Sequence, residues 1–166
     1  MIMRKLLFLF LAALVCGCSA VNDGDDEVVE RVRVGDRLPA FSVAMTMADG
    51  SQGLFSTQQL TGATVVVLFH TTCPDCQREL PRLNAYYERH RRDEGFQLVC
   101  VSRAEGQESV AAFWADNGLT MPYAAQQDRR VYDLFASAVI PRVYFADANG
   151  TVTRIDIETV GLLDGQ

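Results

Sequence analysis

Lysine is almost absent from this sequence: Lys5 is the only one in 166 residues. Schiff-base catalysis needs a lysine amine and the P-loop needs a lysine that binds phosphate, so neither chemistry is available beyond residue 5. The 21 acidic residues outnumber the 15 basic ones and give a formal net charge of −6. An acidic protein is repelled by the phosphate backbone, which argues against nucleic acid as a partner.

Cysteine is also scarce. The five cysteines are Cys16, Cys18, Cys73, Cys76 and Cys100, and the first two end an N-terminal apolar run. The remaining three are too few for a disulfide-rich scaffold or for a four-cysteine zinc site. The close pair Cys73 and Cys76 therefore has to be explained by its reactivity.

The N-terminus has the composition of an export signal. Arg4 and Lys5 precede about a dozen apolar residues, a run too short to span a membrane as a stable helix. The run ends in Val15-Cys16-Gly17-Cys18, which resembles the lipobox of bacterial lipoproteins. The resemblance implies that residues 1–17 are a signal peptide and that Cys18 becomes a lipid-modified N-terminus. The alternative is an ordinary signal peptide cut near Ala20.

Residues 18–31 are predicted to be an acidic, flexible tether, since residues 22–27 are polar, acidic and unlike a packed segment. Ser19 replaces the aspartate that resembles an inner-membrane retention signal, which favours the outer membrane. Acidic residues after the lipidated cysteine also resemble surface-export signals. Cleavage leaves 13 basic against 21 acidic residues, a net charge of −8. Residues 32–166 are long enough for one domain with a proper core.

One stretch carries the chemistry. The apolar run 65–69 predicts a strand buried on both faces, and short polar residues follow it. Thr72 can cap a helix whose first turn holds Cys73, with Pro74 near the first helical position. The helix dipole and the free N–H groups there favour a thiolate. Cys73 can then attack a disulfide, and Cys76, one turn later, can resolve the mixed intermediate.

Periodicity and turn signals predict an α/β domain with a sheet of mixed direction and no internal repeat. Asp49-Gly50 and Asn149-Gly150 are hairpin turn signals, and Pro81 lies inside a predicted helix that it should kink. The predicted strands are 41–47, 52–55, 64–69, 96–102, 122–124, 142–146 and 151–157, and the predicted helices are 74–92, 105–117 and 127–135.

With these elements placed, residues 34–157 resemble the TlpA/ResA-like thiol–disulfide oxidoreductases of the thioredoxin-like (redoxin) superfamily. The resemblance implies a three-layer α/β/α domain with a mixed central sheet and an N-terminal β-hairpin. The C-terminal helix is expected to be short, within 158–166, or missing. Four features carry the resemblance: the entry segment 34–41, the Cys-x-x-Cys-x-x-Glu-x-Pro pattern from Cys73 to Pro81, the Ile140-Pro141 pair before a strand, and the turn 147–150.

The resemblance implies an enzyme of the cell envelope that faces the periplasm, exchanges disulfides through Cys73 and Cys76 and needs no cofactor or metal. Pro141 would form a cis peptide bond beside the dithiol, and Ile140 would present its backbone to an extended substrate, with Thr72 alongside. Expected partners are disulfide- or thiol-bearing envelope proteins and an upstream membrane thiol donor. Glu79 matches the acid that this subfamily places as a proton shuttle, although most glutamates on helices are simply solvated.

The sequence departs from the family at several positions. Thr72 replaces a tryptophan that often precedes the first cysteine, which widens access to the site. Val67 stands where thioredoxins place a buried acid. A reduced C-terminal helix would leave one sheet face poorly covered and so suggest a partner or a dimer. Packing is the simplest interpretation for His70, at the end of a buried strand, and for Cys100, inside one.

Charge suggests the direction of electron flow. Strong oxidants stabilise their thiolate, which favours the reduced form. Asp75 and Glu79 add negative charge near Cys73, and neither residue between the cysteines is basic. Negative charge opposes a thiolate, so we expect a reductant.

Two other functions remain possible on these residues. A thiol peroxidase of the peroxiredoxin type shares the entry segment, but its nucleophile usually follows Pro-x-x-x-Thr-x-x-Cys, and Val66 and His70 occupy those places. A copper-delivery chaperone would use Cys73, Cys76 and His70 as ligands. The spacing of the two cysteines is one residue shorter than in that family.

Overall fold

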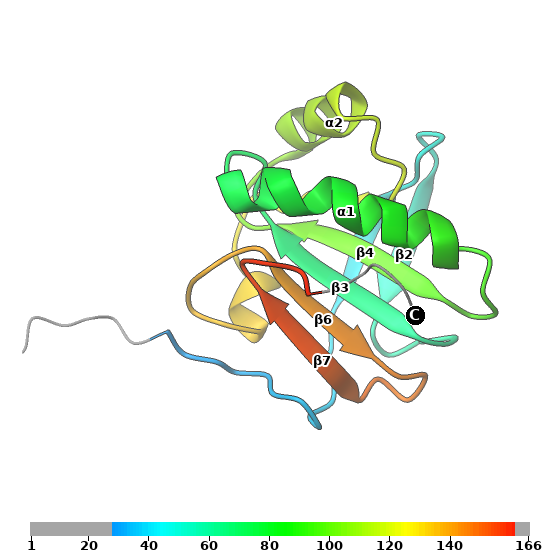
Figure 1. The fold of residues 1–166 in the computed structure, drawn as a ribbon, viewed down its shortest axis with the longest axis vertical. Helices are drawn as coiled ribbons and strands as arrows, with labels where there is room; N and C mark the ends of the chain where they lie inside the picture. The colour runs from blue at the N-terminus through cyan, green and yellow to red at the C-terminus, as the bar shows by residue number, and fades with distance from the viewer. Residues whose placement is uncertain (1–27, 162–166) are drawn as a thin grey trace, which may run out of the picture.

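The computed structural model describes residues 28–161. The predicted signal peptide, the lipidation site Cys18, most of the tether and residues 162–166 lie outside this range. The described residues form a mixed seven-stranded sheet in the order β2-β1-β5-β4-β3-β6-β7, with β7 at one edge and β2 at the other (Figure 1). The predicted α/β class, mixed sheet and N-terminal β-hairpin are confirmed. The strands are β1 (Ser42–Thr46), β2 (Gln52–Ser56), β3 (Thr64–Phe69), β4 (Gln97–Ser102), β5 (Tyr123–Ala124), β6 (Arg142–Ala146) and β7 (Val152–Ile157).

Strand β3 is the centre of the sheet. It pairs in parallel with β4 and antiparallel with β6, and all six of its residues are buried. A strand covered on both faces needs apolar side chains on both, which the sequence Thr-Val-Val-Val-Leu-Phe supplies. The segment that follows β3, which contains the two cysteines, is therefore held by the most buried part of the molecule.

Two helices cover one face of the sheet. Helix α1 (Pro74–His90) connects β3 to β4, and α2 (Gln107–Asp116) connects β4 to β5. Both connections join parallel strands and step in the same direction across the sheet, so the right-handed crossover rule places both helices on one face. Figure 1 shows α1 lying across that face. Both helices begin and end within two residues of their predicted bounds.

Ring contacts from β6 identify the two faces. Phe145 lies 6.0 Å from Tyr86 of α1, while its neighbour Tyr144 lies 4.7 Å from Phe135, which is fully buried. Because successive residues of a strand point to opposite faces, Phe135 belongs to a layer on the side away from α1. Phe41 packs against Phe135 at 5.9 Å, so the predicted layer on this second face is present, although both α-helices of the described residues lie on the other face.

The predicted helix 127–135 is wrong in extent, because only one 3-10 turn, η1 (Tyr132–Leu134), forms there. The chain is fixed on both sides of the turn, by a bridge between Glu105 and Gln126 and by a bridge between Glu30 and Ala136. The Asp128 carbonyl also accepts the Ala104 N–H at 2.9 Å, so the backbone at the start of the predicted helix is paired with another segment.

Both ends of the described chain pack against the domain. The Arg31 N–H donates to the Phe135 carbonyl and the Ser137 N–H donates to the Val29 carbonyl, so residues 29–31 are part of the folded domain and the predicted tether is too long at this end. At the other end, residues 158–161 form no helix, and Val160 is buried. Among the described residues, no helix is long and apolar enough to cross a membrane.

Candidate active site

Cys73 lies at the start of α1. Its backbone is extended (φ −77°, ψ 121°), its carbonyl accepts the Gln77 N–H at 3.0 Å, and Pro74 begins the helix. Cys73 itself is therefore the N-cap residue, and the predicted cap by Thr72 is wrong. The Thr72 hydroxyl instead lies 3.1 Å from His70 Nδ1. At the N-cap, Cys73 lies beside the free N–H groups of the first helical turn.

Cys76 lies one helical turn further on, on the buried side of α1. It is fully buried, whereas Cys73 is partly exposed, and both are free thiols in this structure. Burial raises the pKa of the Cys76 thiol, and this effect exceeds the opposing backbone hydrogen bond from His70. The two thiols are therefore unequal: a second protein can reach Cys73, and Cys76 lies behind it as an uncharged thiol.

The Ile140–Pro141 peptide bond is cis, as predicted. The Ile140 carbonyl oxygen lies 3.6 Å from Cys73 Sγ, although the two residues are 67 positions apart. The loop before Pro141 is held by side chains: Arg142 donates to the carbonyls of Ala138 (2.7 Å) and Val139 (3.0 Å). The structure thus brings the attacking thiol and the loop predicted to receive substrate into one site.

Glu79 is buried, with 1% of its surface exposed. Its carboxylate accepts hydrogen bonds from Arg78 Nε (2.9 Å), Arg82 Nη1 (2.7 Å) and the Val160 N–H (3.3 Å). It follows Cys76 by three residues and shares the buried side of α1. These contacts tie α1 to the C-terminal segment, which gives Glu79 a structural task besides the proton transfer that the resemblance implies.

The negative charges near Cys73 are compensated. Asp75 Oδ1 accepts a hydrogen bond from Arg78 Nη1 at 2.7 Å, and the same arginine bonds Glu79 through Nε. An ion-paired carboxylate opposes a nearby thiolate less than a free one does. Asp75 and Glu79 therefore favour a reductant less strongly than their positions in the sequence suggest.

A second buried acid, Glu105, was not predicted as part of the site. It is 7% exposed and accepts hydrogen bonds from the Thr71 N–H (2.8 Å) and from the Thr71 hydroxyl. Its Oε2 lies 3.5 Å from His70 Nδ1. The sequence contained a signal for this position: parallel strands β3 and β4 end at the same edge of the sheet, so an acid three residues after β4 lies near residues that follow β3.

The other noted residues lie in packed surroundings. Val67, at the β3 position where a thioredoxin is expected to carry a buried acid, is a fully buried apolar side chain. Cys100 is fully buried, and its sulfur lies 3.9 Å from that of Met121. Within residues 28–161, no three histidine, cysteine, aspartate or glutamate side chains are arranged to hold a metal ion, so the copper-chaperone alternative gains no support from the geometry.

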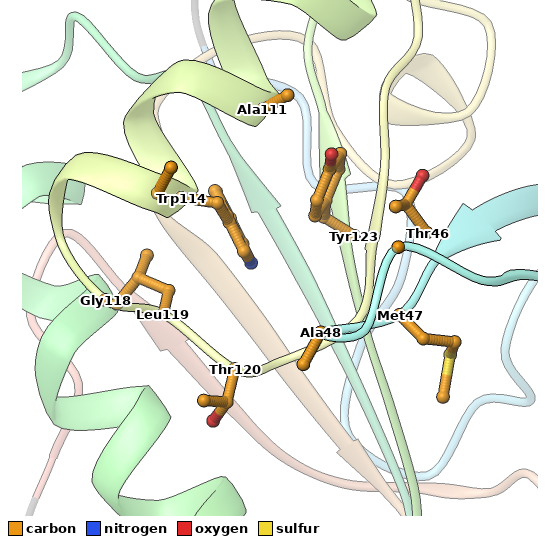
Figure 2. A pocket seen from close by; sticks show the side chains of 11 residues that line it. Thr46, Met47, Ala48, Ala111, Trp114, Gly118, Leu119, Thr120 and Tyr123 are labelled. Atoms are coloured by element: carbon orange, nitrogen blue, oxygen red, sulfur yellow. The ribbon is translucent and has the colours of Figure 1, made fainter.

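A pocket of about 330 Å³ lies between α2 and the β1–β2 turn, away from the dithiol (Figure 2). The rings of Trp114 and Tyr123 line it side by side, with centroids 5.0 Å apart. Their polar atoms are already satisfied: Trp114 Nε1 donates to the Met121 carbonyl at 2.8 Å, and the Tyr123 hydroxyl accepts from Gln107 Nε2 at 2.9 Å. The pocket contains none of the predicted site residues.

The fold and the dithiol at the start of α1 define the class of this protein, a thioredoxin-like thiol–disulfide oxidoreductase. Among known protein families, the one described as "AhpC/TSA family" matches residues 34–155. This match spans most of the chain, and the protein belongs to the AhpC/TSA family.

Curated relatives agree with that class, and solved structures share the fold. The chain is 28% identical to "Thiol-disulfide oxidoreductase ResA" of Oceanobacillus iheyensis, over 93% of this chain and 79% of the relative, and 26% identical to the protein of the same name from Geobacillus kaustophilus, over 93% and 86%. A putative protein disulfide isomerase from Bacteroides thetaiotaomicron has a similar structure (TM-score 0.68, 24% identity, 76% and 80% covered). StoA from Bacillus subtilis has the same fold (TM-score 0.57, 22% identity, 72% and 90% covered).

Proposed function

We propose that this protein reduces disulfide bonds of exported proteins in the bacterial cell envelope. Cys73 attacks the substrate disulfide, one substrate cysteine leaves as a thiol, and the other remains bound to Cys73 as a mixed disulfide. Cys76 then attacks Cys73, which releases the second substrate thiol and leaves a Cys73–Cys76 disulfide. The observation that supports this order is the inequality of the two thiols: Cys73 is accessible at an N-cap, and Cys76 is fully buried behind it.

The substrate segment is proposed to lie along the loop that ends at Pro141. The Ile140 carbonyl lies beside Cys73 Sγ, and Thr72, the residue before Cys73, is exposed. An extended peptide can pair with backbone groups of Ile140 while its disulfide approaches Cys73. Glu79 is proposed to help move the proton that Cys76 must lose before it attacks, in addition to tying down Val160.

The reducing direction is supported chiefly by the burial of Cys76. Burial keeps this thiol uncharged, so the reduced form gains no stabilisation from a thiolate at Cys76 and gives up its electrons more readily. Regeneration requires a dithiol donor, which we propose to be a membrane thiol carrier. A potential as oxidising as that of a dedicated disulfide donor would contradict this direction.

The decisive experiment is a trap. Cys76→Ser should accumulate mixed disulfides through Cys73 in the cell envelope, and mass spectrometry of the adducts should identify the substrates. Cys73→Ser is the matched control and should trap none. If Cys76→Ser captures no protein while the purified wild type rapidly consumes peroxide with a thiol donor, the family's thiol peroxidase alternative replaces the exchange function.

Envelope placement through a lipid on Cys18 is a separate part of the proposal. It is supported by the lipobox-like sequence alone. Labelling of cells with a fatty-acid analogue should mark the wild type but not Cys18→Ala, and fractionation should move the variant out of the membrane fraction. Equal labelling of both proteins would refute the anchor.

A further inference from the structure

The turn between β3 and Cys73 is held by a side chain from another part of the chain. Two consecutive backbone N–H groups there have side-chain acceptors: the Thr71 N–H donates to Glu105 Oε2 at 2.8 Å, and the Thr72 N–H donates to His70 Nδ1 at 3.2 Å. Glu105 also accepts from the Thr71 hydroxyl. The carboxylate of Glu105 thus makes two hydrogen bonds to one residue of the active-site turn.

Glu105 is itself rigidly placed. Its N–H donates to the Gln126 carbonyl at 2.7 Å, and its carbonyl accepts from the Ser102 hydroxyl at 2.6 Å. Ser102 in turn accepts the Gln126 N–H at 2.7 Å. The residue before it, Ala104, has a left-handed backbone (φ 57°), so the chain turns sharply to bring Glu105 inward. A buried acid fixed in this way is a preorganised support rather than a mobile surface group.

The turn matters because its backbone contacts the residues at and beside both cysteines. The His70 carbonyl accepts the Cys73 N–H at 3.2 Å. The Thr71 carbonyl accepts a hydrogen bond from Gln77 Nε2 at 2.8 Å, and Gln77 directly follows Cys76 in α1. A displacement of Thr71 would therefore move the two backbone carbonyls that bind the Cys73 N–H and the Gln77 side chain.

We propose that Glu105 is a positioning residue for the resolving step: its carboxylate fixes Thr71, whose carbonyl binds the Gln77 side chain beside Cys76. The step it supports is the attack of the Cys76 thiolate on Cys73, in which the bond between Cys73 and the substrate sulfur breaks and the substrate leaves as a thiol. This inference rests on the thiol–disulfide exchange proposed above. The acid that supports the dithiol in this protein would then be Glu105, three residues after β4. The β3 position at which thioredoxins are expected to place a buried acid holds Val67.

The test measures the two chemical steps separately. Glu105→Gln keeps the size of the side chain but removes its negative charge, so the charge-assisted hydrogen bond from the Thr71 N–H becomes a weaker neutral one. With a fluorescent disulfide peptide and stopped flow, we expect Cys73 attack to stay within threefold of wild type and the lifetime of the mixed disulfide to rise tenfold or more. Glu108→Gln, an exposed glutamate on α2, makes the same chemical change away from the site and should alter neither step.

Two more measurements make the outcome decisive. Glu105→Asp keeps the charge and both acceptor oxygens, so it should restore part of the resolution rate. All variants are compared at a temperature at which circular dichroism shows each to be folded. If Glu105→Gln lowers the unfolding temperature but leaves the mixed-disulfide lifetime unchanged, Glu105 is only structural and the proposal is overturned. If the wild type forms no mixed disulfide at all, the proposed exchange function fails instead.

Discussion

The ion pair between Glu30 and Arg142 offers the sharpest test of how this fold supports its site. The Arg142 side chain is 1% exposed, and Nη1 and Nη2 lie 2.6 and 2.8 Å from the two Glu30 oxygens. The same guanidinium donates to the carbonyls of Ala138 and Val139, just before Ile140. One N-terminal carboxylate therefore compensates the buried cation that holds the loop beside Cys73.

Glu30→Ala leaves that cation buried without its counter-charge. Removing one partner of a buried pair typically costs about 3–5 kcal/mol. The Glu30 side chain is 35% exposed, and Arg142 keeps its bonds to two carbonyls, so we expect a loss of unfolding free energy below that range, about 2–3 kcal/mol. For a domain of this size, this loss corresponds to a fall in melting temperature of roughly 6–15 °C.

Urea unfolding followed by circular dichroism measures the loss, with an unchanged slope as evidence that only stability has changed. Asp133→Ala is the matched control, because it removes a carboxylate from an exposed pair with Arg129, which should contribute less than about 1 kcal/mol. Glu30→Ala should also slow disulfide exchange as the loop loosens. If Glu30→Ala costs no more than the control, Arg142 does not depend on Glu30 and the reasoning is refuted.

Three further perturbations test other parts of the molecule. In the native reduced protein, iodoacetamide should modify Cys73 at neutral pH and reach Cys76 only in alkaline solution, because burial raises the pKa of Cys76; mass mapping that finds equal labelling at pH 7 would contradict this. Gly95→Ala should lower the urea midpoint, since the added Cβ would lie 2.2 Å from the Thr61 carbonyl oxygen and Gly95 has φ +71°. Leu83→Ala should cost about 2–5 kcal/mol in the same assay, because this α1 side chain is fully buried.

Elements defined by local patterns were predicted well. The run 65–69 has apolar residues on both faces and a sharp polar boundary, and β3 matches it within one residue. Asn149-Gly150 predicts a β-hairpin. Strands β6 and β7 pair antiparallel across this turn, in which Gly150 has φ +79°. The dithiol was equally visible, because Cys73 and Cys76 lie at a strand-to-helix boundary that the sequence marks with Pro74.

Features that depend on distant contacts were predicted poorly. Residues 29–31 look like a tether because they follow an acidic run, and only their pairing with residues 135–137 makes them part of the domain. Residues 127–135 have a helical period, but the Asp128 carbonyl is paired with the Ala104 N–H from another segment, so only the turn η1 forms. Thr72 has the composition of a cap, but its hydroxyl lies near His70, and the chain leaves the cap to Cys73. In the first two cases the competing partner is far away in the sequence, and in the third it is the nearby side chain of His70.

The predicted direction of electron flow depends on two carboxylates whose ion-pair partner is visible only in the structure. In sequence, Asp75 and Glu79 are two uncompensated negative charges near Cys73, and they alone argued for a reductant. In the structure, Arg78 bonds both carboxylates, so most of their field is cancelled within one ion-pair distance. Burial of Cys76 now carries the argument, because a thiol that stays uncharged gives the reduced state no electrostatic advantage. The proposed direction is the same, but its physical cause is the burial of Cys76 instead of surface charge. Added salt screens exposed charges but has little effect on a buried group, so the redox potential should depend only weakly on salt concentration.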